Sequence, residues 1–595
     1  MAVSSELKLS DYVARFLAKQ GVDTVFALSG GASLHLIHSV EAHPDLQLVC
    51  PLHEQAAAAA ADGYSRLSGR FGVAVTTSGP GATNLITGIC CSFYDSVPTL
   101  FITGQVSTFR MVGDTGVRQI GFQETPTVSL VSPVTKYAVT VTDPGRIRHE
   151  LEKAVFIMKS GRPGPVLVDI PDNLQREMIE AGSLESFRPP AAPVRRFASA
   201  AVSKPTVLSL LAAAERPVIV AGWGVVLAGV QEQFRTFVRA TGMPVALTWG
   251  AADLLVDEDP LNIGRFGTHG VRHANFAVQN ADLVLSLGSR LDTKSTGSPV
   301  NTFARAAKKI VIDIDANELG KFAKFGLEAD MLIEDDLRNF LDLFSVVELE
   351  ATVRRREPWL AKIARWRADL GEFDRNRRRQ ISGLNPYEFV TQLSRLAPDN
   401  ATVVVDTGCA IAWVMQAWEV RFGQRVLHDC NNTAMGWSLG AALGCYFAEP
   451  ERPLLIIIGD GSIMMTLQEL ASIRKHAIPA KIFLLNNSGY AMIQQTQDQW
   501  LGSRYVASSV TGGLGFPDFR QIAHAFGYKH IEISERTDMA EILRGNLESD
   551  DPVLFEVVIP SHARVVPQVK FGRPNEDMEP LLPRDVFSAQ MLIDR

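Results

Sequence analysis

The stretch Gly459-Asp460-Gly461-Ser462 and the pair Asn486-Asn487 are the residues whose types and spacing first suggest chemistry. Each group follows a short apolar run, residues 453–458 in one case and 481–485 in the other. Runs of this length predict buried strands, and a helical pattern over 465–476 separates them. A carboxylate and a carboxamide would then lie just past the carboxyl ends of two parallel strands, where open sheets bind ligands.

Oxygen donors of this kind beside a helix N-terminus suit Mg²⁺ together with a phosphate group. The alternative is an ordinary Gly-Asp-Gly turn and an Asn-rich loop, because both are common turn sequences. The spacing alone leaves both interpretations open.

Glu54 is a second candidate, because it follows a predicted strand at 46–50 and precedes the alanine run 56–61. A carboxylate at the start of a helix is favoured by the helix dipole, so Glu54 could be only a capping residue. It could instead be a half-buried acid that shares a proton with a cofactor ring nitrogen. The Gly-rich turn at 78–84 is common in proteins and weak evidence by itself. Met435 could be core filler, and His53 and His269 could be ordinary buried histidines.

The composition limits the classes of function. With 46% hydrophobic and 21% charged residues, the chain has an ordinary globular balance, and its 595 residues suffice for roughly three or four domains. A net charge of −7 argues against a nucleic-acid-binding surface. The six cysteines lack C-x-x-C spacing, so we expect reduced thiols in a cytoplasmic protein. The N-terminus lacks the apolar segment of a signal peptide, and no apolar run is long enough to cross a bilayer.

Three α/β domains with parallel sheets are expected to position these residues. Short apolar strands alternate with helical patterns in residues 1–185, 195–345 and 385–570, and 571–595 form a Pro-punctuated C-terminal tail. A Pro-rich linker at 189–193 joins the first two domains. The charged stretch 349–381 could be a solvated helical connector or a basic patch for an acidic partner. The expected strands outside those already named are 24–28, 72–77, 100–103, 166–170, 217–221, 244–247, 283–287, 309–315 and 402–405.

Taken together, the motifs resemble the thiamin-diphosphate (ThDP) enzyme superfamily, and within it the acetolactate-synthase-like branch. The resemblance rests on Gly-Asp-Gly-Ser followed by Asn-Asn, with His53-Glu54-Gln55 far upstream. Further stretches occur in the order of that family, at 29–32, 77–84, 122–126, 161–166, 312–315 and 434–436. The resemblance implies a pyrimidine-binding domain, a central FAD-binding-like domain and a diphosphate- and Mg²⁺-binding domain.

The resemblance also implies roles for individual residues. Asp460, Asn487 and the main-chain oxygen of Gly489 would hold Mg²⁺. The ThDP-binding residues would be Glu54 at N1′ of the aminopyrimidine, Pro80 and Asn84 beside that ring, Met435 beneath the thiazolium, and Gly408, Cys409, Gly459, Gly461 and Ser462 at the diphosphate. The substrate side would be formed by Gly31, Phe122 and Gln123, with Glu54 as the catalytic acid. This chain has Cys409-Ala410 where many acetolactate synthases have Gln-His.

The middle domain is similar to the FAD-binding domain of the same branch. The implied contacts are Gly222, Gly224, Thr248, Thr268, His269, Gly288, Arg290, Asp313 and Asp330. In that family the flavin takes no redox part in the main reaction. The superfamily also places the first domain of one subunit against the third domain of another, which implies a homodimer or homotetramer with sites between subunits.

The acceptor pocket departs from ordinary acetolactate synthases. Those enzymes have a tryptophan in the stretch after Asn-Asn, where alignment without gaps puts Thr496, whereas Arg290 is retained to meet an acceptor carboxylate. These departures resemble carboligases that build yersiniose-type branched sugars. Such enzymes decarboxylate pyruvate and add the two-carbon unit to a ketone acceptor, a nucleotide-linked 4-keto-deoxysugar, which gives a tertiary alcohol.

We therefore expect a carboligase with a sugar-ketone acceptor. The alternatives are an acetolactate synthase that joins pyruvate to pyruvate or 2-oxobutyrate, and another ThDP lyase or transferase. Glyoxylate carboligase does not fit, because that enzyme lacks the glutamate that Glu54 supplies. A non-catalytic regulatory or binding subunit is the alternative from another class.

Overall fold

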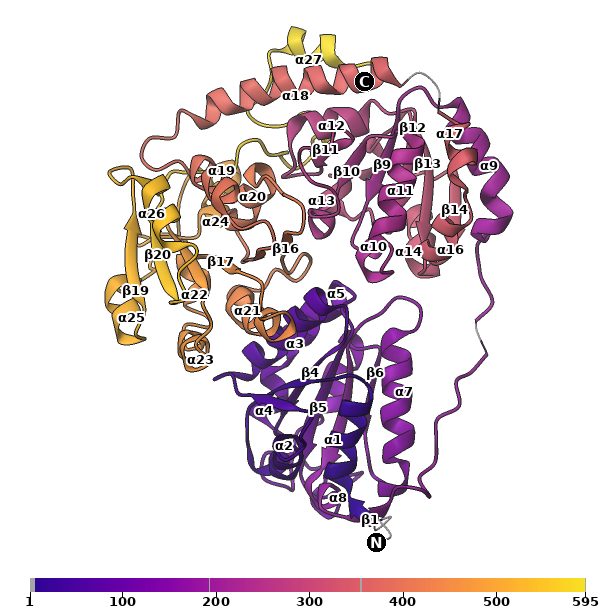
Figure 1. The fold of residues 1–595 in the computed structure, drawn as a ribbon, viewed down its shortest axis with the longest axis vertical. Coiled ribbons are helices and arrows are strands. Elements are labelled where there is room, and N and C mark those ends of the chain that lie inside the picture. Colours follow the sequence, from indigo (N-terminus) through magenta and orange to yellow (C-terminus); the bar gives the residue numbers. More distant parts are fainter. Residues whose placement is uncertain (1–5, 192, 354–355, 594–595) are drawn as a thin grey trace.

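A computed structural model describes residues 6–191, 193–353 and 356–593, arranged as three α/β units (Figure 1). Several expectations extend past these ranges. The first five residues of the expected first domain, Ala192 of the linker, Arg354 and Arg355 of the charged stretch, and the last two residues of the tail lie outside the described residues.

The first sheet is parallel, with strands in the order β3-β2-β4-β5-β7-β6. Its strands are β2 (Thr24–Ala27), β3 (Gln47–Val49), β4 (Gly72–Thr76), β5 (Thr99–Gln105), β6 (Tyr137–Thr140) and β7 (Val166–Pro171). The helices around it include α1 (Leu9–Lys19), α2 (Leu34–Glu41), α3 (Glu54–Ser68), α4 (Pro80–Asn84), α5 (Ile86–Tyr94) and α7 (Ile147–Lys159). A separate antiparallel pair joins β1 (Glu6–Lys8) to β8 (Met178–Glu180).

The third sheet repeats this strand order with β16-β15-β17-β18-β20-β19. Its strands are β15 (Thr402–Val405), β16 (Arg425–Leu427), β17 (Leu454–Gly459), β18 (Lys481–Asn486), β19 (Lys529–Ile533) and β20 (Val553–Val558). Its helices include α19 (Pro386–Leu396), α20 (Cys409–Ala417), α21 (Trp437–Ala448), α22 (Asp460–Ile463), α23 (Glu469–Lys475), α24 (Ala491–Trp500), α25 (Phe519–Ala525) and α26 (Met539–Asn546). The helix expected over 465–476 is present as the shorter α23, and an additional short helix, α22, precedes it, so two helices rather than one separate β17 from β18.

The middle sheet has a different order, β11-β10-β9-β12-β13-β14. Numbered along its own domain this is 3-2-1-4-5-6, the order of dinucleotide-binding folds. Its strands are β9 (Pro217–Ala221), β10 (Val245–Leu247), β11 (Asn262–Arg265), β12 (Leu283–Leu287), β13 (Lys308–Asp313) and β14 (Met331–Glu334). The helices around it include α9 (Ala200–Ala213), α10 (Gly224–Leu227), α11 (Gln231–Thr241), α12 (Arg272–Gln279), α14 (Ala316–Gly320), α16 (Leu337–Asp342) and α17 (Val346–Glu350). Three parallel six-stranded sheets confirm the expected fold class.

The charged stretch after the middle sheet contains a long helix, α18 (Glu357–Arg378). Trp359, Ile363, Trp366 and Leu370 are buried at helical spacing, and Asp374 forms a buried ion pair with Arg272 of α12. The stretch therefore contains a helical connector, as expected, but one face of the helix is buried and not solvated. The C-terminal α27 (Arg584–Gln590) lies beside it (Figure 1), and Trp366 Nε1 donates to Gln590 Oε1 at 2.8 Å.

Two expectations drawn from composition can be compared with the described residues. All six cysteines are free thiols. Within residues 6–191, 193–353 and 356–593, no helix has both the length and the apolar character needed to cross a bilayer.

Helices α3 and α21 pack closely enough to join the first and third domains. A Cβ atom on Gly444 of α21 would lie 1.8 Å from the Ala60 carbonyl oxygen, and one on Gly63 of α3 would lie 2.3 Å from that of Ala441. Only residues without bulky side chains permit such an approach of two backbones. The alanine run of α3 is thus a packing surface as well as a strong helix former.

Gly444→Ala should lower stability by about 1–3 kcal/mol, because the added methyl group forces the two helices apart. The measurement is the free energy of unfolding from denaturant titration. Gly545→Ala on α26 is the matched control, since a Cβ there meets nothing within 4 Å. Equal stability of the two variants would contradict the close packing of α3 against α21.

Candidate active site

The candidate cofactor residues lie where the strand order of the third sheet reverses. Strands β15 and β17 are neighbours, but their next strands lie on opposite sides, which opens a crevice at their carboxyl ends. Gly408 follows β15 and adopts a φ of 81°, with nothing within 4 Å of a Cβ position. Cys409 begins α20, and burial raises the pKa of its thiol to about 12. Asp460 follows β17 and begins α22.

Asp460 organises the metal-candidate residues through its two carboxylate oxygens. Oδ1 accepts a hydrogen bond from the Gly461 amide at 2.7 Å. Oδ2 accepts from the amides of Asn487 and Gly489, each at 3.1 Å. Burial raises the pKa of Asp460 to about 6, although these amides partly oppose the effect. The structure therefore brings the three predicted ligands together.

The Asn487 side chain provides a test of the metal assignment. One end of its amide lies 2.7 Å from the Gly489 carbonyl oxygen and 3.2 Å from Asp460 Oδ2. With nitrogen at that end, the amide donates to both oxygens. With oxygen there, three oxygens converge, and only a cation between them removes the repulsion. Oxygen donors of this kind fit Mg²⁺ shared with a diphosphate. No group of three His, Cys, Asp or Glu side chains suited to a metal occurs among the described residues.

Other side chains hold this metal loop from the neighbouring strands. Asn486 Nδ2 donates to Glu556 Oε1 at 2.7 Å, and Glu556 Oε2 lies 2.8 Å from His530 Nε2. Gly461 packs beneath Tyr490, whose ring would lie 2.1 Å from a Cβ at that position. Glycine is therefore required at the first turn of α22.

Asp406 is a supporting residue that we did not predict. Its carboxylate accepts hydrogen bonds from the amides of Gly436 at 3.1 Å and Ser438 at 3.0 Å. It is buried, which raises its pKa, while hydrogen bonds including that from Ser462 lower it. Asp406 thus fixes the turn that presents Met435. Its place directly after a predicted strand, as with Asp460, was the signal that could have revealed it.

Glu54 lies at the first position of α3 with a buried side chain. Asn84 Nδ2 donates to Glu54 Oε2 at 2.9 Å, so the structure brings these two predicted residues together. The cap of α3 is His53, whose Nδ1 accepts from the Gln55 amide at 3.1 Å. Glu54 is therefore not the residue that caps α3, although it is an acidic residue in the first turn of that helix. Pro80 begins α4, the short helix that ends at Asn84.

Two of the three substrate-side residues, Phe122 and Gln123, belong to a loop held by Glu124. Its carboxylate accepts from the backbone amides of Val112, Ile120 and Gly121. Gln123 adopts a φ of 63° and packs against Gly79, where a Cβ would lie 2.9 Å from that of Gln123. Phe122 is 86% exposed, and Gly31 is also exposed. Within the part of the chain that the structure describes, no hydrogen bond or ion pair joins the Glu54–Asn84 pair to the Asp460 group.

A large cavity lies at the corresponding reversal in the middle sheet, between β9 and β12. It has about 1240 Å³ of empty space, including the part open to solvent, and all three domains line it. The predicted FAD residues that line it are Gly222, Gly224, Thr248, His269, Gly288, Arg290 and Asp313. Trp223 also faces it, and its buried Nε1 has no hydrogen-bond partner. A cradle of glycine backbone with an unpaired donor fits an extended polar ligand such as a dinucleotide.

Two predicted FAD residues do not line this cavity. Thr268 Oγ1 lies 3.1 Å from His269 Nδ1, beside the cavity rather than in its wall. Asp330 accepts a hydrogen bond from the Lys309 amide at 2.8 Å, at the start of β13. Asp335 and Asp336 occupy the wall instead, because they follow β14 at the ligand-binding edge of the sheet.

The charged residues of the cavity differ in whether they have partners. Arg290 Nε lies 3.4 Å from Glu318 and its Nη1 donates to the Tyr94 carbonyl oxygen at 3.2 Å. Lys294, which we did not predict, lies with its ammonium 4.1 Å from the centre of the Trp249 ring. Burial lowers the pKa of Lys294. No described carboxylate lies within ion-pair distance of it, so it is a cation ready for an anionic ligand.

Thr496, the other residue predicted for the acceptor pocket, is half-buried on α24. Its hydroxyl donates to the Met492 carbonyl oxygen of its own helix at 3.2 Å. Since this bond satisfies the hydroxyl, Thr496 offers a ligand mainly the space around a small side chain.

Comparisons with known proteins agree with this architecture. The chain matches three parts of the thiamine pyrophosphate enzyme family: the N-terminal TPP binding domain over 7–127, the central domain over 205–343 and the C-terminal TPP binding domain over 406–557. It is 33% identical to the acetolactate synthase large subunit of Parasynechococcus marenigrum (strain WH8102), over 94% of this chain and 89% of the relative. A probable acetolactate synthase 2 of Oryza sativa subsp. japonica is 34% identical over 96% of this chain and 85% of the relative.

The chain therefore belongs to the thiamine-pyrophosphate-dependent enzymes, in the acetolactate-synthase-like branch. This confirms the expected superfamily and supports a ThDP-dependent enzyme over a non-catalytic subunit. The relatives support a pyruvate-using carboligase. They favour acetolactate synthesis, which we kept as an alternative, over transfer to a nucleotide-linked sugar.

Asp460→Asn should weaken Mg²⁺ binding at least about tenfold, because neighbours outside the ligand shell already contribute about 10–100-fold in affinity at metal sites. Titration calorimetry of ThDP with varied Mg²⁺ measures the change. Asp399→Asn, an exposed position of the same domain, is the control. Because burial raises the pKa of Asp460 to about 6, Mg²⁺ affinity should also fall as the pH drops below about 6. Unchanged affinity in Asp460→Asn would contradict the metal assignment.

Glu54→Gln should reduce turnover by about 100-fold or more, because the amide cannot exchange a proton with a ring nitrogen. It retains the shape of the side chain and an oxygen that can accept from Asn84, so ThDP should still bind. Steady-state turnover together with ThDP affinity measures the separation. Glu41→Gln, at the exposed end of α2, should behave as the unmodified chain does. Near-normal turnover in Glu54→Gln would refute its role as the acid.

Proposed function

We propose that this chain catalyses an acetolactate-synthase-type reaction. It decarboxylates pyruvate and adds the resulting two-carbon unit to the carbonyl group of a second 2-oxo acid. The observation that carries this proposal is the unpaired cation Lys294 in the cavity wall, in a chain whose full-length relatives are acetolactate synthases.

The charge balance of the cavity favours an acceptor with one carboxylate. Arg66 is paired with Asp62 and Asp95, Arg162 with Glu318, and Arg290 lies close to Glu318. Lys294 is the lining cation, among the described residues, for which no carboxylate lies within ion-pair distance. A carboxylate bound beside the Lys294 ammonium would favour its charged form, which burial disfavours. One such cation suits the single carboxylate of a 2-oxo acid.

The chain's own residues divide the remaining work. When bound, thiamin diphosphate supplies the electron sink for decarboxylation and carbon–carbon bond formation. Asp460, Asn487 and the Gly489 carbonyl oxygen would hold Mg²⁺ and anchor the diphosphate. Glu54 would share a proton with N1′ of the aminopyrimidine ring, in an orientation that Asn84 maintains at 2.9 Å. Met435 would support the thiazolium from the turn that Asp406 fixes.

FAD would occupy the glycine-lined part of the cavity as a structural cofactor.

A second copy of the chain would complete the active site, in a homodimer or homotetramer. The 86% exposure of Phe122 and the 48% exposure of Met465 support the second copy, since apolar side chains near a candidate site seldom face water. The domain limits 1–185, 195–345 and 385–570 are retained within this proposal.

Transfer to the ketone of a nucleotide-linked 4-keto-deoxysugar is the second candidate. Thr496 favours it, because a small side chain leaves room where acetolactate synthases have a tryptophan. The two candidates predict products of different mass.

The deciding experiment supplies pyruvate, ThDP, Mg²⁺ and FAD, with either 2-oxobutyrate or a nucleotide-4-keto-sugar, and identifies the products by mass spectrometry. We expect acetolactate from pyruvate alone and the mixed acetohydroxy acid with 2-oxobutyrate. A branched sugar without either acid would overturn the proposal in favour of the second candidate. Pyruvate-dependent CO₂ release without any ligated product would refute both.

Lys294→Met should raise the KM for the acceptor about tenfold or more, because a hydrogen bond to a charged group contributes about 1.5–3 kcal/mol. Lys294→Arg keeps the charge and should restore most of the affinity. Initial rates at varied 2-oxobutyrate and fixed pyruvate measure the effect. If Lys294→Met shows an unaltered KM, Lys294 does not bind the acceptor.

A further inference from the structure

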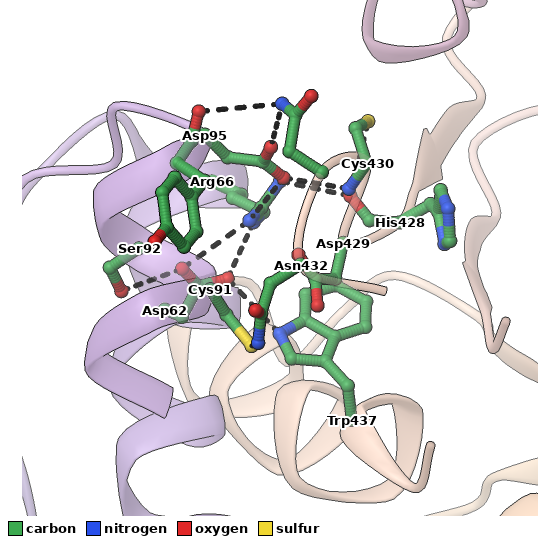
Figure 2. A network of polar contacts seen from close by, with 12 residues as sticks. Asp62, Arg66, Cys91, Ser92, Asp95, His428, Asp429, Cys430, Asn432 and Trp437 are labelled. Atoms are coloured by element: carbon green, nitrogen blue, oxygen red, sulfur yellow. Dashed lines mark hydrogen bonds and ion pairs between the residues drawn. The ribbon is translucent and has the colours of Figure 1, made fainter. Parts of the chain in front are cut away.

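A buried cluster of charged side chains joins the first and third domains beside the cavity (Figure 2). Arg66 of α3 lies between two carboxylates, with Nε 2.5 Å from Asp62 Oδ1 and Nη2 2.9 Å from Asp95 Oδ2. These three side chains are at most 3% exposed. Such a cluster is tolerated only where hydrogen bonds satisfy the remaining polar atoms.

Most of those hydrogen bonds come from the third domain, as Figure 2 shows. The Cys430 amide donates to Asp95 Oδ2 at 2.7 Å, and Asn431 Nδ2 donates to Asp95 Oδ1 at 2.5 Å. Arg66 Nη1 donates to the His428 carbonyl oxygen at 2.9 Å. The cluster therefore holds the third-domain backbone on both sides of Asp429.

The segment held in this way leads directly to the thiazolium-supporting residue. Asp429 Oδ2 accepts from the Ala434 amide at 2.8 Å, and Thr433 adopts a φ of 52°, so residues 429–434 form a compact turn. Met435 follows it. Trp437, the first residue of α21, donates from Nε1 to Asp62 Oδ1 at 3.2 Å. Both ends of the turn that carries Met435 are thus attached to the cluster.

The same cluster also forms part of the cavity wall. Arg66, Asp95, Cys430 and Asn431 all line the cavity in which we place the flavin. We propose that Arg66 and Asp95 are positioning residues that couple occupancy of this cavity to the geometry of Met435, so that bound FAD strengthens ThDP binding. The inference rests on the flavin part of the proposed function and on the ThDP chemistry of the family. Because coupling between two sites is reciprocal, ThDP strengthens FAD binding by the same factor.

A purely structural role for the cluster gives a different result. Breaking it would then lower the stability of the protein, but the effect of FAD on ThDP affinity would stay the same. The ratio of ThDP dissociation constants without and with FAD therefore separates coupling from simple attachment of the domains.

The test measures this ratio by titration calorimetry on the full chain in its native assembly, with saturating Mg²⁺. The unmodified chain should bind ThDP at least about fivefold more tightly with FAD present. In Asp95→Asn the ratio should fall close to one, because the variant lacks the charge that pairs with Arg66. Asp23→Asn is the matched control: it breaks the exposed pair of Asp23 with Arg70, which does not line the cavity, and should retain the full ratio.

Asn431→Ala keeps the test decisive if Asp95→Asn does not fold. It removes the hydrogen bonds that Asn431 Nδ2, on an exposed residue, donates to Asp95 Oδ1 and to the Tyr94 carbonyl oxygen, and it leaves the Arg66–Asp95 pair intact. Its ratio should lie between those of the unmodified chain and Asp95→Asn. A ratio of one in the unmodified chain, a failure of FAD to bind, or an unchanged ratio in the foldable variants overturns the proposal. Because no product is measured, an error in the acceptor assignment leaves this result unaffected.

Discussion

The backbone-to-backbone packing of α3 against α21 is the constraint on which the rest of the structure depends. Positions such as Gly63 and Gly444 allow the two helices to approach so closely that added Cβ atoms would overlap the opposite backbone. The first turn of α3 carries Glu54, and the turn before α21 carries Met435. Fixing one helix on the other therefore fixes two predicted cofactor contacts from different domains in a single packing event.

The three sheets use one rule to place their functional residues. In each sheet, candidate residues follow the two strands at which strand order reverses, β2 and β4, β9 and β12, and β15 and β17, or a strand next to them, as Glu54 follows β3 and Asn487 follows β18. Side chains there need only short turns to meet in one crevice. The glycines at these turns, including Gly222 and Gly408, leave the backbone accessible, while Asp460 supplies charge. This arrangement explains why residues far apart in sequence can converge without long loops.

Strand and motif positions were predictable because buried parallel strands are short apolar runs and ligand-binding residues follow them directly. Asp460, Asn487 and Glu54 could be found in this way. Strands with mixed burial, such as β6 and β19, gave no such run and were missed.

Asp330 was misplaced because the ligand-binding edge of the middle sheet comes five residues later, at Asp335. Asp406 directly follows a predicted strand and could have been found by the same rule, whereas Lys294 could not be recognised, since its importance depends on neighbours that only the folded chain brings near. The contacts that link the Arg66–Asp95 pair to residues 428–431 were also unpredictable, because they join segments more than 300 residues apart.

The identical strand order of the first and third sheets is the pattern that duplication of one ancestral domain would produce. No repeat is visible between their sequences, yet both sheets share one connection pattern and expose equivalent edges. Duplication of an ancestral unit leaves this trace when side chains diverge faster than topology. In such a history each copy inherits a ready-made crevice, so one can specialise for an aromatic ring and the other for a phosphate. The two duplicated domains can then bind different parts of one ligand after changes in side chains alone, without a change of fold.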